Sequence, residues 1–272
     1  MRGNNLDPTQ VKVKEIARDY IKVAKDEQYS ELFWKLDKFK DTHLVVVDDN
    51  NQPIGIISTK DFTRVLTDRL RRKRLAHIFA SGLMTPNPIS ISGDESIANA
   101  VKIMLDQGIS SLLVKVDGKY KIITKRDFLK HTDLIANKPL KEVMTKNPIT
   151  AAVGTKLTGA EMMMRERKIS TLPVVNDGEL VGHVDIRLIS RKLVELFLEP
   201  EHKHPEKLLK EITLGDIMSN PLFITPETNT HTLSKKLLKK EFKGTGIVTS
   251  EGNPRVIGVI TETDLAKLVL ET

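Results

Sequence analysis

The sequence lacks cysteine altogether, and aromatic residues make up only 4% of its 272 positions. Without cysteine the chain forms no disulfide, no thiolate zinc site and no cysteine nucleophile. Long apolar runs are also absent, because no window approaches the roughly 18 consecutive apolar residues of a membrane-spanning helix. The first residues, MRGNNLDPTQVKVKE, carry no apolar signal-peptide core. These absences predict a cytoplasmic protein without a membrane partner.

Recognisable catalytic motifs are missing as well. The sequence contains no GxSxG, no HExxH and no phosphate-cradling GxxxxGKS. The segment EHKHPE places His202 and His204 among glutamates, but a solvated linker explains it better than a metal site does. We therefore expect no enzyme, no catalytic cofactor and no metal.

The charge balance is basic, with a formal net charge of +7. Positive charge favours an anionic partner, whether phosphates, nucleic acid or an acidic protein surface. The densest basic run is RLRRKR, from Arg69 to Arg74. No aromatic residue interleaves with this run, so a solvated helix end explains it better than a nucleic-acid site.

Two phrases recur along the chain, which indicates an internal repeat. The first phrase ends each of four units and the second opens three of them, while the first unit has only YIKVAKDE at the matching place. The closing phrase reads GIISTKDF from Gly55, KIITKRDF from Lys121, GHVDIRLI from Gly182 and GVITETDL from Gly258, and the opening phrase reads LMTPNPIS from Leu83, VMTKNPIT from Val143 and IMSNPLFI from Ile217.

Each unit is predicted to run strand, helix, strand, strand, helix, which is an α/β (α+β) fold. A short apolar strand follows the Asn-Pro turn, because proline biases its neighbour toward extended geometry. Apolar residues at helical spacing come next, two apolar runs around a turn indicate a hairpin, and a final helix closes the unit. In the first unit the helical residues are Tyr29, Leu32, Phe33 and Leu36, and the closing helices start at Ser58, Thr124, Asp185 and Thr261.

The closing phrase pairs a hydroxyl with an acidic residue three positions later in three of the units. This pattern is a capping box in form, and capping alone explains any single copy. A helix start beside a carboxylate also suits a nucleotide, because the carboxylate accepts hydrogen bonds from ribose hydroxyls while basic surroundings attract phosphate. The third unit has Asp185 and Leu188 at these two positions. The ligand hypothesis therefore predicts that the pocket of the third unit has lost the carboxylate that binds the sugar.

Glycine inside the closing strand indicates a close approach of a backbone or ligand, because glycine otherwise weakens a strand. Three units have such a glycine, at Gly55, Gly182 and Gly258, and Lys121 breaks the rule in the second unit.

Four copies in register resemble the CBS domain family, named for cystathionine beta-synthase, over nearly the whole chain after about residue 11. The resemblance implies two Bateman modules, each with two repeats around a pseudo-twofold axis, assembled into a disc. Module 1 would cover residues 1–136, with repeats at about 11–70 and 80–133. Module 2 would cover residues 137–272, with repeats at about 138–196 and 211–270.

The same resemblance implies an adenosine-type ligand. The chain is similar to the gamma regulatory subunit of AMP-activated protein kinase, which also has four copies and senses AMP, ADP and ATP. We therefore expect a regulatory adenine-nucleotide sensor that changes module geometry on binding and signals to a separate, unidentified protein, with a homodimer also compatible with the sequence. The alternatives are another adenosyl ligand, such as S-adenosylmethionine, and nucleic acid, which is not favoured.

The family's binding residues transfer by position. The base pocket would use Ile89 opposite Asp61 and Ile149 opposite Asp264, although either isoleucine could equally be core. Serine or threonine stands at 110, 111, 170 and 171, where the kinase subunit tends to have histidine or arginine, which puts selectivity for polyphosphates in doubt. The implied ribose contacts are Ser58, Asp61, Thr124, Asp127, Thr261 and Asp264, and the implied phosphate contacts are His43, Lys60, Arg126 and Lys243.

Overall fold

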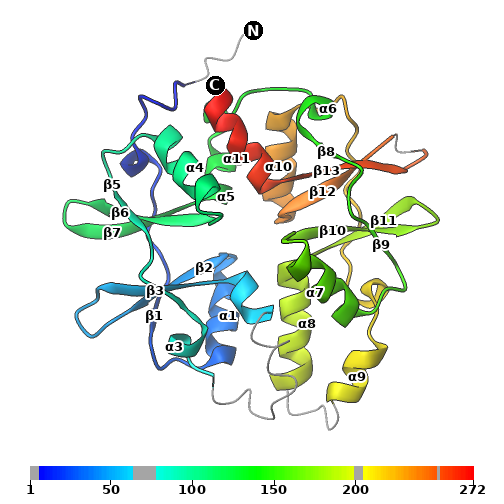
Figure 1. The fold of residues 1–272 in the computed structure, drawn as a ribbon, viewed down its shortest axis with the longest axis horizontal. Helices are drawn as coiled ribbons and strands as arrows, with labels where there is room; N and C mark the ends of the chain where they lie inside the picture. The colour runs from blue at the N-terminus through cyan, green and yellow to red at the C-terminus, as the bar shows by residue number, and fades with distance from the viewer. Residues whose placement is uncertain (1–5, 64–77, 199–204, 250–251) are drawn as a thin grey trace. The chain divides into compact units, whose positions relative to one another are not determined.

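The structure, a computed structural model, describes residues 6–63, 78–198, 205–249 and 252–272. Helices and small mixed sheets alternate along the chain, as the α/β prediction requires (Figure 1). The basic run from Arg69 to Arg74 and the histidines His202 and His204 lie outside the described residues. No helix in the described ranges is long and apolar enough to cross a membrane.

The chain forms two compact units, and each unit combines segments that are distant in sequence. The first unit contains Met1–Asp19, Ile89–Pro148 and Leu222–Thr272, and the second contains Tyr20–Pro88 and Ile149–Pro221. Three of the boundaries fall directly after the Asn-Pro turns. The bodies of the second and fourth repeats therefore share the first unit, and those of the first and third repeats share the second. The division into modules at residues 1–136 and 137–272 stays a prediction.

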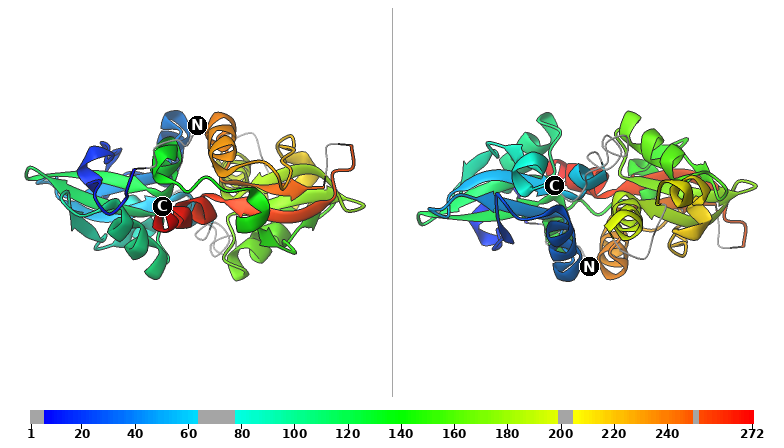
Figure 2. Two further views of the ribbon diagram at one scale, coloured as in Figure 1. Left: turned by 90° about the horizontal axis from the view of Figure 1, so that it is seen from above. Right: turned by 90° about the horizontal axis from the view of Figure 1, so that it is seen from below.

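The first unit has two three-stranded sheets, with strand orders β5-β6-β7 and β12-β13-β8. Each sheet is built on an antiparallel hairpin, β6 with β7 and β12 with β13. Helices α10 (orange) and α11 (red) can be followed in Figures 1 and 2. The elements are η1 (Val13–Glu15), β5 (Ser90–Ser92), α4 (Ile97–Asp106), β6 (Ser111–Val116), β7 (Lys119–Thr124), α5 (Lys125–Lys130), η3 (Thr132–Leu134), α6 (Leu140–Val143), β8 (Thr145–Lys146), α10 (Thr230–Lys240), β12 (Gly244–Val248), β13 (Val256–Thr261), α11 (Glu262–Lys267) and η5 (Leu268–Glu271).

The second unit has a four-stranded sheet of order β1-β2-β3-β4 and a three-stranded sheet of order β11-β10-β9. Residues 59–63 are helical and begin the closing helix of the first repeat. The elements are β1 (Lys22–Ala24), α1 (Tyr29–Phe39), β2 (His43–Val47), β3 (Pro53–Ser58), α3 (Ala80–Leu83), β4 (Thr85–Pro86), β9 (Ala151–Ala152), α7 (Leu157–Glu166), β10 (Thr171–Asn176), β11 (Glu179–Asp185), α8 (Ile186–Leu198), α9 (Pro205–Glu211) and η4 (Leu214–Asp216).

One continuous apolar cluster fills each unit, and both repeats of the unit contribute to it. In the first unit, buried residues such as Met104 and Leu129 belong to the same cluster as Leu265. In the second unit, Phe33 belongs to the same cluster as Ile189. A single repeat is too small to bury an adequate core, so this sharing is the expected solution.

The locally encoded elements match their predictions. The apolar stripe from Tyr29 lies on α1, and all four predicted core residues of that stripe are buried. The Asp-Gly turns at 117–118 and 177–178 have positive φ at both residues, 47° and 76° in the first and 50° and 83° in the second. Two positive φ values are typical of the type I′ hairpin turn, which matches the twist of the strands.

Two expectations at the Asn-Pro turns are wrong. Asn87 and Asn147 do not have extended geometry, because both have a φ of 52° in the left-handed region, which asparagine tolerates better than most residues. The fourth repeat has no assigned strand after its turn within the described residues. In the described residues its backbone contacts β12 there through one hydrogen bond, from the Val248 amide to the Ile224 carbonyl at 2.9 Å, and the Thr245 hydroxyl donates to the Leu222 carbonyl at 3.2 Å. Pro221 and Pro226 bracket this short segment and remove amide donors from the ladder.

The opening phrase of each repeat pairs with the closing strand of a different repeat. Thr85 of the second repeat pairs with Ile56 of the first, and Thr145 of the third pairs with Val259 of the fourth. Isolated bridges make the two reciprocal pairings, Arg18 with Ile122 and Ser219 with His183. Arg18, Thr85, Thr145 and Ser219 therefore occupy equivalent positions. The segment of the first repeat that corresponds to the opening phrase thus begins at Ile16, and the match to YIKVAKDE, which begins at Tyr20, is wrong.

Candidate functional site

The closing phrase lies where a strand ends and a helix begins, and this junction brings its hydroxyl and carboxylate together. Asp61 Oδ2 accepts hydrogen bonds from the Ser58 amide at 2.7 Å and the Ser58 hydroxyl at 2.8 Å. Thr124 donates to Asp127 Oδ2 in the same way, at 2.9 and 2.8 Å. Thr261 donates to Asp264 Oδ2 at 3.0 and 2.8 Å. The capping boxes expected from the sequence are therefore present.

In all three repeats the cap uses one carboxylate oxygen, Oδ2. A carboxylate has two oxygens with about four lone pairs, so capping leaves it further acceptor capacity. At Asp264 the second oxygen, Oδ1, lies 3.5 Å from the Lys267 ammonium, and the side chain is 16% exposed. Helix capping and ligand binding are therefore compatible roles for the same residue.

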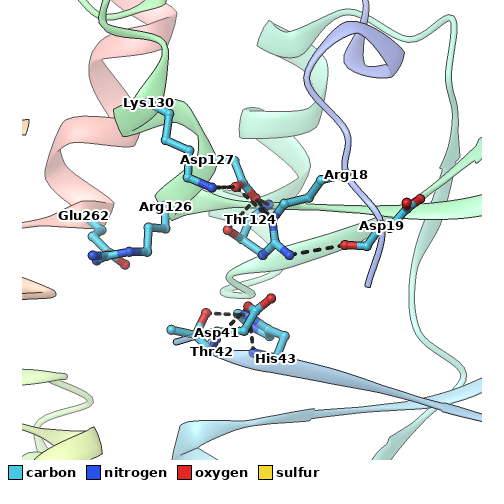
Figure 3. Close-up of polar contacts among 10 residues, drawn as sticks. All are labelled: Arg18, Asp19, Asp41, Thr42, His43, Thr124, Arg126, Asp127, Lys130 and Glu262. Carbon is cyan, nitrogen blue, oxygen red and sulfur yellow. Dashed lines mark hydrogen bonds and ion pairs between the residues drawn. The ribbon is translucent and has the colours of Figure 1, made fainter. Parts of the chain in front are cut away.

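Asp127 differs, because two cations occupy its carboxylate (Figure 3). Arg18 Nε lies 3.0 Å from Oδ1 and 3.2 Å from Oδ2, and Lys130 Nζ lies 2.8 Å from Oδ1. Burial, the largest influence, acts to raise the pKa of Asp127, but Arg18, Lys130 and the Thr124 hydroxyl outweigh it, so this pKa is lowered. The charged form of Asp127 is thus held by protein cations.

The third repeat caps its helix with a different residue. Asp185 Oδ1 accepts hydrogen bonds from the amides of Arg187 and Leu188, at 2.9 and 3.0 Å. Asp185 Oδ2 and the hydroxyl of its cross-strand partner Thr171 are buried and have no hydrogen-bond partner among the described residues. Nothing in the sequence indicated that these two polar atoms would be buried together.

His183 lies two residues before Asp185 on the same strand and is 2% exposed. Burial is the main cause that lowers its pKa to about 4, Arg187 adds to the shift, and Asp185 opposes it. The imidazole is therefore neutral at pH 7.

The phosphate candidates all lie within or next to the closing phrase of a repeat in their own unit. His43 is the cross-strand partner of Ser58, is buried, and shares a 2.8 Å hydrogen bond between its Nδ1 and the Thr42 hydroxyl (Figure 3). Lys60 has an exposed side chain, yet the loss of hydration around its ammonium lowers its pKa, an effect that Asp61 opposes. The carbonyl of Lys243 accepts a hydrogen bond from the Glu262 amide at 2.9 Å.

Arg126 is already engaged within the protein. Its guanidinium donates to Glu262 at 2.5 Å and to the Phe242 carbonyl at 3.1 Å, and it points away from Asp127 in Figure 3. The Arg126 and Glu262 side chains are only 16% and 13% exposed. This pair joins the second repeat to the fourth, which the sequence did not predict.

The base-pocket candidates are not core residues. Ile89 is 40% exposed and Ile149 is 37% exposed, although large apolar side chains are usually buried. Ile89 and Asp61 belong to different compact units, as do Ile149 and Asp264. Their predicted juxtaposition stays a prediction.

The strand glycines mark a close approach, but the nearest group is a methionine side chain of the opening phrase rather than the backbone or ligand that was expected. A Cβ added at Gly258 would lie 2.5 Å from Met144 Sδ, and one at Gly182 would lie 2.5 Å from Met218 Sδ. Met84 approaches Gly55 in the same way. The sequence showed both partners, but not that they meet.

Within the described ranges no cluster of three or more histidine and acidic side chains could hold a metal ion. The acidic residues of the three closing phrases accept hydrogen bonds from a hydroxyl and an amide of their own phrase, and two of them also lie beside a lysine.

Known proteins share this architecture. A protein from Methanocaldococcus jannaschii, proposed as an archaeal homolog of γ-AMPK, superposes with a TM-score of 0.81 at 21% identity, covering 94% of this chain and 99% of that one. An uncharacterized 33.4 kDa protein of the ribosomal RNA operon of Thermofilum pendens is 25% identical over 239 residues, which are 82% of this chain and 79% of that protein.

An inosine-5'-monophosphate dehydrogenase from Nitrosopumilus maritimus is 36% identical over 132 residues, which are 47% of this chain and 26% of the enzyme. This chain thus spans about a quarter of the length of that relative. The family model described as CBS domain matches residues 13–68, 80–133, 140–195 and 214–271. With four matches over most of its length, the chain belongs to the CBS domain family.

Proposed function

We propose that this chain is a regulatory protein that binds an adenine nucleotide, AMP, ADP or ATP, by its ribose. CBS domains are generally ligand-binding regulators, and the carboxylates of the closing phrase are the acceptors suited to a ribose diol. The observation that carries the proposal is that the two carboxylate oxygens have different contacts: Oδ2 of Asp264 caps the helix, and Oδ1 lies 3.5 Å from the Lys267 ammonium. Asp61 and Asp264 are the assigned ribose residues, with Ser58 and Thr261 holding them in place.

Charge supports the phosphate part of the ligand. The formal net charge is +7, and His43 and Lys60 lie beside the closing phrase that contains Asp61. In the other unit Lys243 lies beside the phrase that contains Asp264. Exposed isoleucines Ile89 and Ile149 offer apolar faces for an adenine ring.

A nucleotide regulates only if it binds one arrangement of the protein better than another. We assign the output to a partner protein that reads this change, because no catalytic motif accompanies the ligand residues in the sequence.

The test is calorimetric titration of the whole chain with AMP, ADP and ATP. Asp264→Asn keeps a carbonyl oxygen for the helix cap but replaces an acceptor with an amide donor, so binding at that site should weaken by about 1 to 3 kcal/mol, or roughly 5- to 150-fold. Asp61→Asn should act likewise at its own site. Leu188→Ala, at the equivalent position of the third repeat, is the matched control and should leave the titration unchanged.

Unchanged isotherms for both asparagine variants, with melting temperatures like that of the wild type, would remove the ribose assignment. Because the cap is preserved, a loss of affinity cannot be ascribed to an unravelled helix start.

A second candidate ligand, S-adenosylmethionine, follows from the Arg126–Glu262 pair. One of the four phosphate candidates is already neutralised by a carboxylate, and an adenosyl ligand without phosphate needs fewer cations. Competition between S-adenosylmethionine and ATP in the same calorimeter separates the candidates, because only the true ligand class displaces the other at low concentration.

A further inference from the structure

One position distinguishes the second repeat from its three relatives. Residues that pair with the closing strand are Thr85, Thr145 and Ser219 in three of the four pairings, and Arg18 in the fourth. The second repeat thus has a long arginine opposite its closing strand, where the other repeats have a short hydroxyl side chain. This arginine lies beside Asp127, the acidic residue of the second repeat.

The residues around Arg18 change together with it. In the other three pairings a methionine precedes the hydroxyl residue and packs over the strand glycine. Where the strand has Lys121 instead of glycine, the residue before Arg18 is the small Ala17. In this pairing the small residue, Ala17, lies on the opening segment and the large one, Lys121, on the closing strand. The backbone pairing of Arg18 with Ile122 is nevertheless the same as in the other repeats.

The fourth repeat supplies an internal comparison for the contact. Asp127 and Asp264 each have a lysine three residues later, Lys130 and Lys267, and each caps its own threonine. The Asp264 side chain is 16% exposed, and that of Asp127 is 3% exposed. Arg18 distinguishes the surroundings of Asp127 from those of Asp264. The equivalent residue beside the fourth repeat is Thr145.

Arg18 makes the contact that a sugar would need. Its Nε reaches both oxygens of Asp127, at 3.0 and 3.2 Å, and its Nη1 donates to the Asp19 carbonyl at 3.4 Å (Figure 3). A hydroxyl pair would have to displace a charge-assisted hydrogen bond in a buried place, where such bonds are strong and costly to break.

We propose that Arg18 is a specificity-determining residue that blocks ribose binding at Asp127, so that the second repeat takes up no nucleotide while Asp61 and Asp264 do. The inference rests on the proposed function and deepens it: the number of ligand sites is set by one cation of the first repeat's opening segment. Arg18 thus makes the hydrogen bonds to the Asp127 carboxylate that the ribose hydroxyls would otherwise make.

The experiment counts AMP molecules per chain by calorimetry in the full-length protein. Arg18→Thr copies the residue found at Thr85 and Thr145, and should add an AMP site that the wild type lacks. That site should vanish again in the double variant Arg18→Thr/Asp127→Asn. Arg18→Lys, which keeps a cation at the carboxylate, is the matched control and should add none.

The reciprocal variant guards against a folding defect in the first. Thr145→Arg places the cation opposite the fourth repeat, at an exposed position, and should abolish the AMP site that depends on Asp264. If Arg18→Thr folds with a wild-type circular dichroism spectrum and gains no site, or if Asp127→Asn alone removes a site from the wild type, the proposal is overturned. Loss of the proposed function appears separately, as wild-type titrations that do not respond to Asp61→Asn and Asp264→Asn.

Discussion

The two oxygens of each closing-phrase carboxylate have different contacts in this protein. These contacts explain why equivalent aspartates have different roles in the four repeats. In the first, second and fourth repeats a hydroxyl and an amide converge on Oδ2. In the third repeat Asp185 caps with Oδ1, and its Oδ2 is buried without a hydrogen bond in the described part of the chain. What each carboxylate can bind depends on what reaches its second oxygen.

The lowered pKa of His183, two residues before Asp185, predicts how the stability of the protein changes in acid. The pKa of His183 is lowered to about 4 in the folded chain from an ordinary value of 6.5, chiefly by burial. The unfolded chain therefore takes up the proton first, and the free energy of unfolding should fall as pH drops from about 6.5 toward 4. A fall of the His183 pKa from 6.5 to about 4 corresponds to a total loss of about 3 kcal/mol in the free energy of unfolding, complete below about pH 4.

Urea unfolding at several pH values measures this loss, and comparison with His183→Gln isolates it from the titration of carboxylates. The two proteins should have parallel curves above about pH 7 and diverge below it. A His183 ring resonance that titrates near pH 6.5 in NMR spectra would contradict the prediction.

At the scale of elements, the opening phrase of one repeat is fastened to the closing strand of another by a methionine over a glycine. A Cβ on Gly258 would lie 2.5 Å from Met144 Sδ, 3.0 Å from its Cγ and 3.3 Å from the Thr145 carbonyl. Close-packed interiors absorb such an overlap only by moving side chains or backbone. The natural exception, Ala17 beside the strand that carries Lys121, follows the same steric rule.

Gly258→Ala should therefore destabilise the protein by about 1 to 3 kcal/mol, the usual cost of overpacking. Met144→Ala should relieve part of that cost, so that a double-mutant cycle gives a favourable coupling between the two changes. Gly154→Ala is the matched control, because nothing lies within 4 Å of an added Cβ there. Additive effects in thermal unfolding would refute the steric account.

Local signals predicted the elements well. The helical spacing in α1 and the Asp-Gly turns of the hairpins depend on neighbours in sequence, and both were correct. The capping boxes were also predictable, because their two residues are three positions apart. The Arg18–Asp127 and Arg126–Glu262 pairs join residues more than a hundred positions apart, and no periodicity in the sequence encodes such contacts.

The whole molecule is organised so that both halves of the chain contribute to each compact unit. The cluster of the first unit contains Leu129 from one half and Leu265 from the other, and in the second unit the Ser190 hydroxyl donates to the Thr59 carbonyl at 3.3 Å. The sequence indicated four repeats that pair around common cores, but which repeats pair depends on surfaces that form only after folding. In the folded chain each of these contacts joins residues from both halves.

Separately produced chains of residues 1–136 and 137–272 should therefore bind each other. Each half would expose apolar surface from α5 or α11, and apolar burial drives association. Size-exclusion chromatography with light scattering should show a heterodimer when the halves are mixed. Halves that remain monomeric and do not combine would indicate instead that each module completes its own core.

The Arg126–Glu262 pair gives this association a charge-swap test. Both side chains are mostly buried, so Arg126→Glu alone places two carboxylates together and should weaken binding between the halves by more than tenfold. Combining it with Glu262→Arg restores opposite charges and should recover much of the affinity. Such recovery requires the two residues to face each other in the reassembled protein, whereas a general loss of stability from either substitution would make the double variant the worst of the three.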